Sequence, residues 1–257
     1  MMTAVAANTW WMTVRRLQAF VQQPAFLVIT LIQPVIWLFL FGALFRRVVE
    51  LPGFGSSSYL DYLVPGVVVM SAVSSNMWAG MGMLEEIERG TLNRFLVTPV
   101  SRSAIINANV VEQGISTTIQ SLVIVGLGLL GGARYDAAGI AVLVLASVVL
   151  GTFFGALSNT IGMLVRQRET IIGFNTLLLL PLTFLSSAFM PAGLMPGWIQ
   201  AIARGNPVDW ALRAGRAAMA TPADWSAVGL YGGALVALAA ATVALSVRTF
   251  RAYQKSV

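Results

Sequence analysis

Long apolar runs separated by short polar stretches make up most of the chain. A transmembrane helix needs about 20 predominantly apolar residues, and six runs approach that length. We place them at about residues 25–45, 62–83, 105–131, 138–164, 170–190 and 226–247. We find no long linker and no convincing internal repeat. The pattern therefore predicts an all-α membrane protein with six transmembrane helices in a single domain, residues 1–257.

The residues before the first run have the pattern of an amphipathic helix. Between residues 8 and 23 apolar side chains recur at helical spacing, and Arg15 and Arg16 lie off that stripe. Such a helix lies in the membrane interface with its apolar face in lipid, and Pro24 would end it. We expect an N-terminal interfacial helix at 8–23. The alternative is a hydrated lead-in to the first span.

The basic residues indicate the orientation in the membrane. An even number of spans puts both termini on one side, and basic residues favour cytoplasmic loops. The side that contains the termini carries Arg15, Arg16, Arg89, Arg94, Arg102, Arg166, Arg168, Arg248, Arg251 and Lys255. The other side carries Arg46, Arg47, Arg134, Arg204, Arg213 and Arg216, the last three in one long loop that counts weakly. We therefore expect both termini in the cytoplasm.

The stretch 85–103, between the second and third runs, is the most charged part of the chain and falls on the cytoplasmic side. Leu84, Ile87 and Phe95 lie near one side of a predicted short helix. Glu85 and Arg89 have the i,i+4 spacing that supports a helix. A proline at position 99 then forces a turn. This pattern indicates either a contact site for a partner or a loop whose arginines only fix membrane topology.

A second unusual segment, residues 188–215, follows the fifth run. It is rich in Pro, Gly and Trp yet still fairly apolar, a composition that suits neither free solvent nor a full crossing. We expect short extracellular re-entrant or surface helices, broken at Pro191 and Pro207. Trp198 and Trp210 would lie at the level of the lipid headgroups, where tryptophan is enriched.

Glycines in the third and fourth runs predict close helix packing. Gly151 and Gly155 have the GxxxG spacing that lets two helices approach closely. The third run adds Gly126, Gly128, Gly131 and Gly132. These positions indicate packing within the chain or, alternatively, a contact between two copies.

Composition excludes several kinds of chemistry. The 257 residues are 57% hydrophobic and 10% charged, with mean hydropathy +0.79, far more apolar than a soluble domain. The chain has no Cys and no His, so thiol nucleophiles, imidazole bases and the commonest zinc ligands are missing, and we expect no catalytic residue and no metal site. Its only lysine, Lys255, is not preceded by the glycines of a phosphate-binding loop. Any ATP must be bound by another polypeptide. The scattered arginines do not suggest nucleic-acid binding.

The chain resembles permeases of the type-2 ABC exporter family, in particular the daunorubicin-resistance branch of bacterial drug and lipid exporters. The resemblance spans nearly the whole chain and rests on two motifs in the right order. The first is Glu-Arg-Gly-Thr-Leu followed by Thr-Pro-Val-Ser-Arg in the stretch 85–103. The second is Phe-Met-Pro, Pro-Gly-Trp-Ile and Asn-Pro in the segment 188–215, at Pro191, Pro196, Trp198, Asn206 and Pro207.

The resemblance implies a non-catalytic subunit in the bacterial inner (cytoplasmic) membrane. Two such permeases, identical or related, pair with two copies of an ABC ATPase, which bind ATP and Mg²⁺, so this chain holds no cofactor. The stretch 85–103 and the N-terminal helix are expected to dock on the ATPase. The matching positions are Arg15, Arg16, Glu88, Arg89, Gly90, Thr91, Arg94, Thr98, Pro99 and Arg102.

Similar permeases line their pathway with the first, second and fifth spans. Aromatic side chains, methionines and a few amides there would suit a large amphiphilic substrate, although any one of them could equally be core or lipid-facing. The candidates in this chain are Trp37, Phe41, Asn76, Met77, Trp78, Met81, Asn175, Thr176, Phe184 and Phe189.

Three functions follow from this picture. The first is ATP-driven export of a hydrophobic or amphiphilic compound, a drug or a lipid, out of the cytoplasm or inner leaflet. The second is export of a lipo-oligosaccharide or glycolipid by the same kind of permease. The third, from another class, is proton-coupled secondary transport. It requires an ionisable group at membrane depth, and Glu112 is the one candidate, unless it lies at the cytoplasmic boundary.

Overall fold

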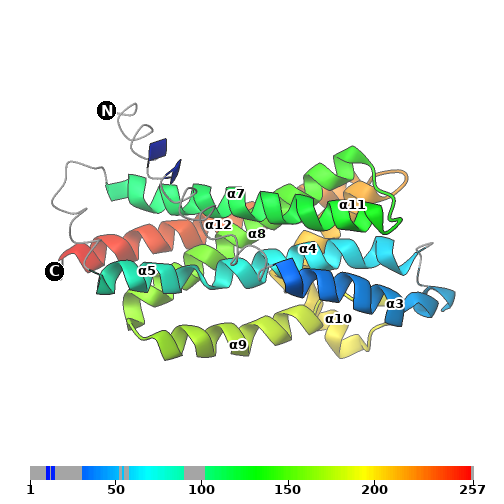
Figure 1. The fold of residues 1–257 in the computed structure, drawn as a ribbon, viewed down its shortest axis with the longest axis horizontal. Coiled ribbons are helices and arrows are strands. Elements are labelled where there is room, and N and C mark those ends of the chain that lie inside the picture. Colours follow the sequence, from blue (N-terminus) through cyan, green and yellow to red (C-terminus); the bar gives the residue numbers. More distant parts are fainter. Residues whose placement is uncertain are drawn as a thin grey trace.

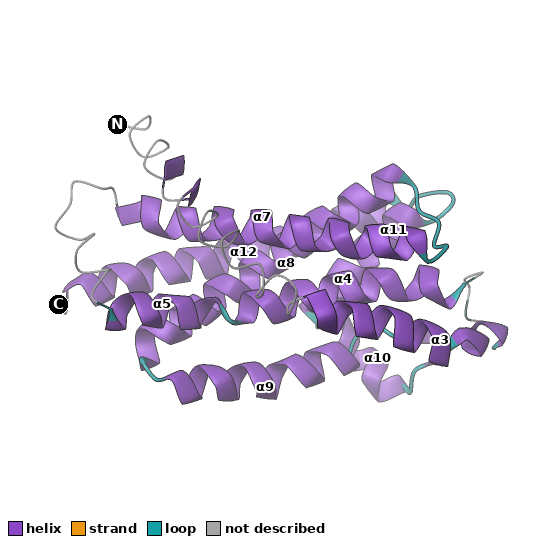
Figure 2. Ribbon diagram, in the orientation of Figure 1, coloured by secondary structure: helices purple, strands orange, loops and turns teal. Residues whose placement is uncertain are grey.

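The computed structural model describes residues 10–11, 13–14, 31–51, 54, 58–89 and 102–255, with side chains for all of these except 102–107 and 253–255. Within these ranges the chain forms helices and turns and no strand (Figure 2). The expected all-α class is therefore confirmed. Four residues between 10 and 14 are helical, and the rest of the predicted interfacial helix at 8–23 lies outside the described residues.

The main helices follow the apolar runs closely. The helix Leu31–Leu44 contains a π-helical turn, Trp37–Phe41, and ends in α3, Gly42–Leu44. The longer helices are α4 (Tyr59–Met77), α5 (Ala79–Glu88), α7 (Arg102–Leu130), α8 (Ala137–Val165), α9 (Arg168–Phe184) and α12 (Trp225–Lys255). The short ones are η2 (Arg46–Glu50), η3 (Ala192–Leu194), α10 (Gly197–Arg204) and α11 (Pro207–Met219).

Among the described residues, four helical stretches are long and apolar enough to cross a membrane: Tyr59–Glu88, Ala108–Leu130, Ala137–Val165 and Trp225–Ala252. The predicted runs 25–45 and 170–190 correspond to shorter helices, Leu31–Leu44 and the 17-residue α9. α9 ends at Phe184, where the Asn206 amide nitrogen donates to the carbonyl oxygens of Leu182 and Leu185, at 2.7 and 3.0 Å. The six-span count stays a prediction.

The long helices lie side by side along the longest axis of the molecule (Figure 1). α8 is at the centre and packs against α4, α5, α7, α11 and α12. The end of α5, the start of α7, the start of α9 and the C-terminus lie at one end of the bundle, which we call the arginine-rich end. Helices α3 and α10 lie toward the other end. This arrangement puts the described ends of the stretch 85–103, residues 85–89 and 102–103, at the same end as the α8–α9 turn.

Glycines bring α5 and α8 into backbone contact. The Ser158 hydroxyl accepts from Gly80 N at 3.0 Å and donates to the Met77 carbonyl. A Cβ atom on Gly162 would lie 2.7 Å from the Gly80 carbonyl oxygen. Elsewhere Gly151 lies against Asn76 and Gly155 against Gln113. In this structure, the GxxxG pair thus packs within the chain.

We expect Gly80→Ala to destabilise the permease by about 1–3 kcal/mol, the usual cost of overpacking a tight interior. Its Cβ would lie 2.3 Å from the Ser158 carbonyl oxygen, and helix backbone cannot move aside cheaply. Gly126→Ala is the matched control, because no atom lies within 4 Å of its Cβ position. Thermal unfolding of the two detergent-solubilised variants checks the prediction. Equal midpoints would contradict the close contact of α5 with α8.

Candidate functional site

A cavity of about 750 Å³ opens between residues 31–37, α4, α5, α7 and α9. Residues 31–37, the α4–α5 stretch and α9 correspond to the first, second and fifth predicted runs, which the family resemblance assigns to the pathway. The cavity's size falls within the range typical of small-molecule sites, about 300–1,000 Å³. The cavity is therefore the candidate transport site.

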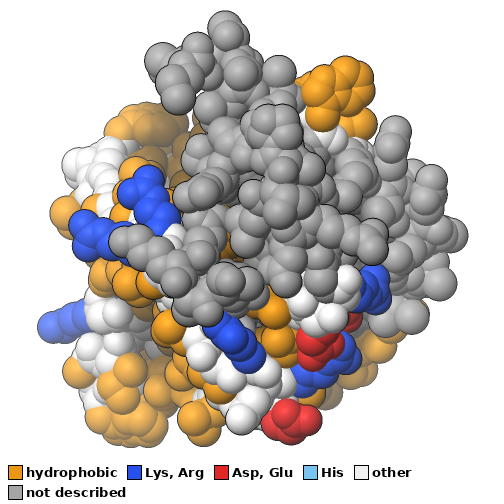
Figure 3. All heavy atoms as spheres, turned by 90° about the vertical axis from the view of Figure 1, so that its left-hand side faces the viewer, with side chains coloured by type: hydrophobic (Ala, Val, Ile, Leu, Met, Phe, Trp, Pro, Cys, Tyr) orange, Lys and Arg blue, Asp and Glu red, His pale blue; other side chains and the backbone are white. Residues whose placement is uncertain are grey.

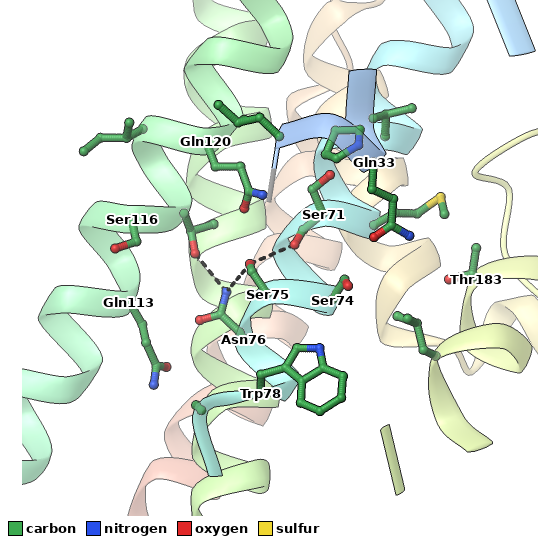
Figure 4. Close-up of a pocket in the computed structure, with 18 of the residues that line it drawn as sticks. Gln33, Ser71, Ser74, Ser75, Asn76, Trp78, Gln113, Ser116, Gln120 and Thr183 are labelled. Carbon is green, nitrogen blue, oxygen red and sulfur yellow. Dashed lines mark hydrogen bonds between the residues drawn. The ribbon is translucent and has the colours of Figure 1, made fainter. Parts of the chain in front are cut away.

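One wall of the cavity is polar and comes from α4 and α7 (Figure 4). On α4, Ser71, Ser74 and Asn76 line it. The Asn76 amide nitrogen donates to Thr117 Oγ1 at 2.9 Å, which ties α4 to α7 across the wall. On α7 the lining side chains are Asn109, Glu112, Gln113, Ser116, Thr117 and Gln120. This wall offers a row of hydrogen-bond donors and acceptors.

The opposite wall is largely apolar. Residues 31–37 and α9 contribute Leu31, Trp37, Leu180 and Phe184. Behind them Phe189 lies 5.4 Å from the Trp37 ring and 5.6 Å from the Phe184 ring, between centroids. Such ring contacts stiffen the wall. The cavity thus combines a hydrogen-bonding face with an aromatic and aliphatic face, which suits an amphiphile.

Five of the ten predicted pathway residues line this cavity: Trp37, Asn76, Trp78, Met81 and Phe184. Phe41 and Phe189 do not line it but pack against the Trp37 ring, at 4.5 and 5.4 Å between centroids. Met77 is buried in the core instead. Asn175 is buried on α9, and its amide has no hydrogen-bond partner in the described part of the chain. Thr176 is exposed and donates a hydrogen bond within its own helix, to the Ile172 carbonyl.

The polar face of α7 is the feature that the sequence analysis missed. Its residues recur every three to four positions, the spacing of one helix face. That spacing is visible in the sequence, but the third run was interpreted from its glycines alone, as a surface for close helix packing. Glu112 also belongs to this face, where it accepts a hydrogen bond from Ser116 Oγ at 3.3 Å. In the structure Glu112 thus lines the cavity.

Helix α11 is one of the short helices in the segment for which we expected re-entrant or surface helices. Pro207 begins it and the Asn206 side chain caps it, accepting from Val208 N at 2.9 Å. The helix packs against α4, α8 and α12, and more than half of it is buried. The break at Pro207 is present, and the buried side of α11 packs against α8. The placement of this segment relative to the membrane stays a prediction. Trp198 on α10 is 63% exposed, and the Trp210 indole donates to the Arg204 carbonyl.

Two arginines that were counted as loop residues are partly buried between helices. Arg216 donates to the Ser187 carbonyl at 2.7 Å and lies 3.7 Å over the Tyr62 ring centroid. Arg213 pairs with the fully buried Asp209. Arg216 directly, and Arg213 through Asp209, hold Ser187, which follows the end of α9.

The arginine-rich end carries exposed basic and acidic side chains (Figure 3). Glu85 and Arg89 form the i,i+4 ion pair that the spacing predicts, at 3.3 Å, and the Arg89 side chain is 73% exposed. Glu88 instead makes two hydrogen bonds with Arg168 at the start of α9. These bonds raise the pKa of Arg168.

The remaining docking candidates lie beyond these contacts. Arg102 is the first residue of α7, and its side chain is not described. Seven candidates lie outside the described residues: Arg15, Arg16, Gly90, Thr91, Arg94, Thr98 and Pro99. Their role in docking therefore stays a prediction.

Long apolar helices around a two-faced cavity define a membrane transport protein. The ABC-2 type transporter family matches residues 7–220, and the chain belongs to that family. The daunorubicin resistance ABC transporter permease protein DrrB1 of Streptomyces coeruleorubidus is 29% identical over 253 residues, 97% of this chain and 87% of that protein. The putative transport permease ycf38 of Pyropia yezoensis is 30% identical over 199 residues, 76% of this chain and 68% of that one.

A third relative is the probable doxorubicin resistance ABC transporter permease protein DrrC of Mycobacterium tuberculosis (strain ATCC 25618 / H37Rv). It is 27% identical over 161 residues, 62% of this chain and 58% of that protein. The family defines the chain as a multi-pass, non-catalytic permease subunit that works with an ABC ATPase. ATP is bound on the separate ATPase subunits.

Proposed function

We propose that this chain is the permease of an ATP-driven exporter that moves a hydrophobic or amphiphilic compound, a drug or a lipid, out of the cytoplasm or inner leaflet. The observation that carries the proposal is the cavity, in which the polar face of α7 opposes the aromatic wall at Trp37 and Phe184. Two of the relatives are named for resistance to daunorubicin and doxorubicin, which supports a drug as one class of substrate.

The proposed assembly contains two permeases and two ATPase subunits in the bacterial inner membrane. Each permease crosses the membrane six times, with Leu31–Leu44 and α9 as the first and fifth crossings and both termini in the cytoplasm. The grouping of Arg89, Arg166, Arg168 and Arg248 at the arginine-rich end supports this orientation. In this orientation the stretch 85–103 meets the ATPase, and α10 lies at the outer side.

Two alternative functions, glycolipid export and proton-coupled transport, are each supported by side chains that line the cavity. The amides of α7 would suit the sugar of a lipo-oligosaccharide or glycolipid. Glu112 lines the cavity and is the ionisable group that proton-coupled transport would need. The same experiment separates all three.

The test uses the permease and its co-purifying ABC ATPase in proteoliposomes. Daunorubicin and a fluorescent glycolipid are the probes, and an ATPase variant without hydrolytic activity is the control. ATP-dependent transport of daunorubicin, lost with the inactive ATPase, supports the proposal. Transport of the glycolipid alone identifies the second function. Transport that persists with the inactive ATPase and follows a pH gradient would refute ATP-driven export.

Blocking the cavity is expected to stop transport without unfolding the chain. Ser74 is partly buried on the cavity wall, so Ser74→Trp would fill part of the space that a substrate needs. We expect transport to fall about tenfold or more, about 1.4 kcal/mol of lost binding. Ala241→Trp on the exposed face of α12 is the control and should leave transport unchanged. Equal transport by both variants would place the substrate elsewhere.

A further inference from the structure

Most of helix α9 is exposed or only partly buried in this chain. Of its 17 residues only Ile171, Asn175 and Thr183 are buried. At its outer end the Asn206 amide bonds the carbonyls of the last turn. α9 also supplies part of the apolar cavity wall. A shift of this helix would therefore reshape the candidate transport site.

At the arginine-rich end, α9 is fastened to α5 by two parallel hydrogen bonds. Arg168 Nε donates to Glu88 Oε1 at 3.3 Å, and a second guanidinium nitrogen donates to Glu88 Oε2. This two-point geometry fixes the orientation of both side chains as well as their distance. The side chains are about half exposed, 49% for Arg168 and 44% for Glu88, so the pair adds little to stability.

Glu88 is the last residue of α5 and belongs to the stretch 85–103 that is expected to meet the ATPase. The pair therefore joins the beginning of that stretch to α9, a helix that lines the cavity. Glu85 and Arg89 cannot do the same, because both belong to α5 or its cap and their ion pair stays on one helix. The Glu88–Arg168 pair, in contrast, bridges α5 and α9.

We propose that the Glu88–Arg168 pair transmits movement of the docking stretch to α9. Arg168 is then a positioning residue for transport. Glu88 binds Arg168 within the permease and does not contact the ATPase. The inference rests on the proposed export function. A weak ion pair is sufficient for this role, because it has to shift α9 between two positions and does not have to stabilise the fold.

The test compares Arg168→Glu, Glu88→Arg and the double variant with exchanged charges, each in complex with the ATPase. Both single variants should co-purify with the ATPase and hydrolyse ATP, while transport falls about tenfold, a usual size for coupling between two sites. The exchanged pair should regain most of the transport. Glu169→Gln, at the neighbouring exposed carboxylate of α9, is the control and should transport like the parent.

A second readout does not depend on transport. The chain has no cysteine, so Thr176→Cys puts a single reactive thiol on the exposed face of α9. The labelling rate should differ between nucleotide-free and vanadate-trapped complexes of the parent. It should be insensitive to nucleotide in each single variant and sensitive again in the exchanged pair.

Three results would overturn the inference. One is an exchanged pair that behaves like the single variants. Another is loss of the ATPase from Glu88→Arg that the exchange does not restore, since Glu88 would then bind the partner directly. The third is a labelling rate that does not respond to nucleotide in the parent. A parent that responds in labelling but transports no probe would instead count against the proposed export function alone.

Discussion

Asp209→Ala is expected to lower the free energy of unfolding by about 3–5 kcal/mol, the usual cost of removing one partner from a buried ion pair. The Asp209 side chain is fully buried. It accepts a hydrogen bond from Ser187 N at 2.8 Å and one from Arg213 Nε at 2.5 Å. Alanine would leave that amide without a partner and the guanidinium without its counter-charge.

Arg216→Met should cost a similar amount for a related reason. The guanidinium bonds the carbonyl and hydroxyl of Ser187, at 2.7 and 3.0 Å, and the Tyr62 carbonyl at 3.1 Å. Methionine fills the space but removes the charged donor from the Ser187 hydroxyl and the Tyr62 carbonyl. The Ser187 carbonyl keeps the hydrogen bond that it accepts from Tyr62 Oη at 2.6 Å. Asp209 and Arg216 both hold Ser187, so the losses in a double variant should not add.

Unfolding in detergent, followed by heating or urea, checks both changes. Arg204→Met is the control, because Arg204 is exposed at the end of α10 and its replacement should stay within about 0.5 kcal/mol of the parent. A double variant that loses the sum of the two single losses would argue against a shared network. A parent-like midpoint for Arg216→Met would refute the buried arrangement itself.

The network of Asp209, Arg213, Arg216 and Ser187 could not be predicted from the sequence. Asp209, Arg213 and Arg216 are spaced i, i+4 and i+7, which puts them on one helix face. That spacing is visible in the sequence. Neither the burial of this face nor its partner could be foreseen, because Ser187 lies 22 residues away on another element. Charge in a Pro- and Trp-rich segment was therefore interpreted as exposed.

The apolar runs predicted the long helices well because bilayer thickness and helical rise leave little freedom. α8 covers Ala137–Val165 where a span was expected at 138–164. α9 was harder, since its end depends on a side chain, Asn206, more than twenty residues away. The cavity was also hard to predict, because it depends on contacts between elements far apart in the sequence. Its aromatic side chains were predicted, but the amides of α7 become a wall only when α4 packs beside α7 and α9 lies opposite them.

The second large effect is expected at the ATPase contact. Reversing Arg89 and Arg94 together, to Glu, should release the ATPase while the permease stays folded in the membrane. The Arg89 side chain is 73% exposed, and its bond to Glu85 is a surface i,i+4 pair worth only about 0.3–0.5 kcal/mol. A partner carboxylate can therefore compete for it. Arg94 lies outside the described residues and is included in the double variant because of the sequence motif alone.

Loss of two favourable charges and gain of two repulsive ones should weaken the complex at least about a hundredfold, or about 3 kcal/mol. Co-purification of the ATPase measures it, with size-exclusion chromatography of the permease as the test of folding. Arg46→Glu, exposed in η2 near the opposite end of the bundle, should keep the ATPase bound. If the double reversal kept the ATPase and full transport, these arginines would be topology markers only, and force would have to enter the bundle elsewhere.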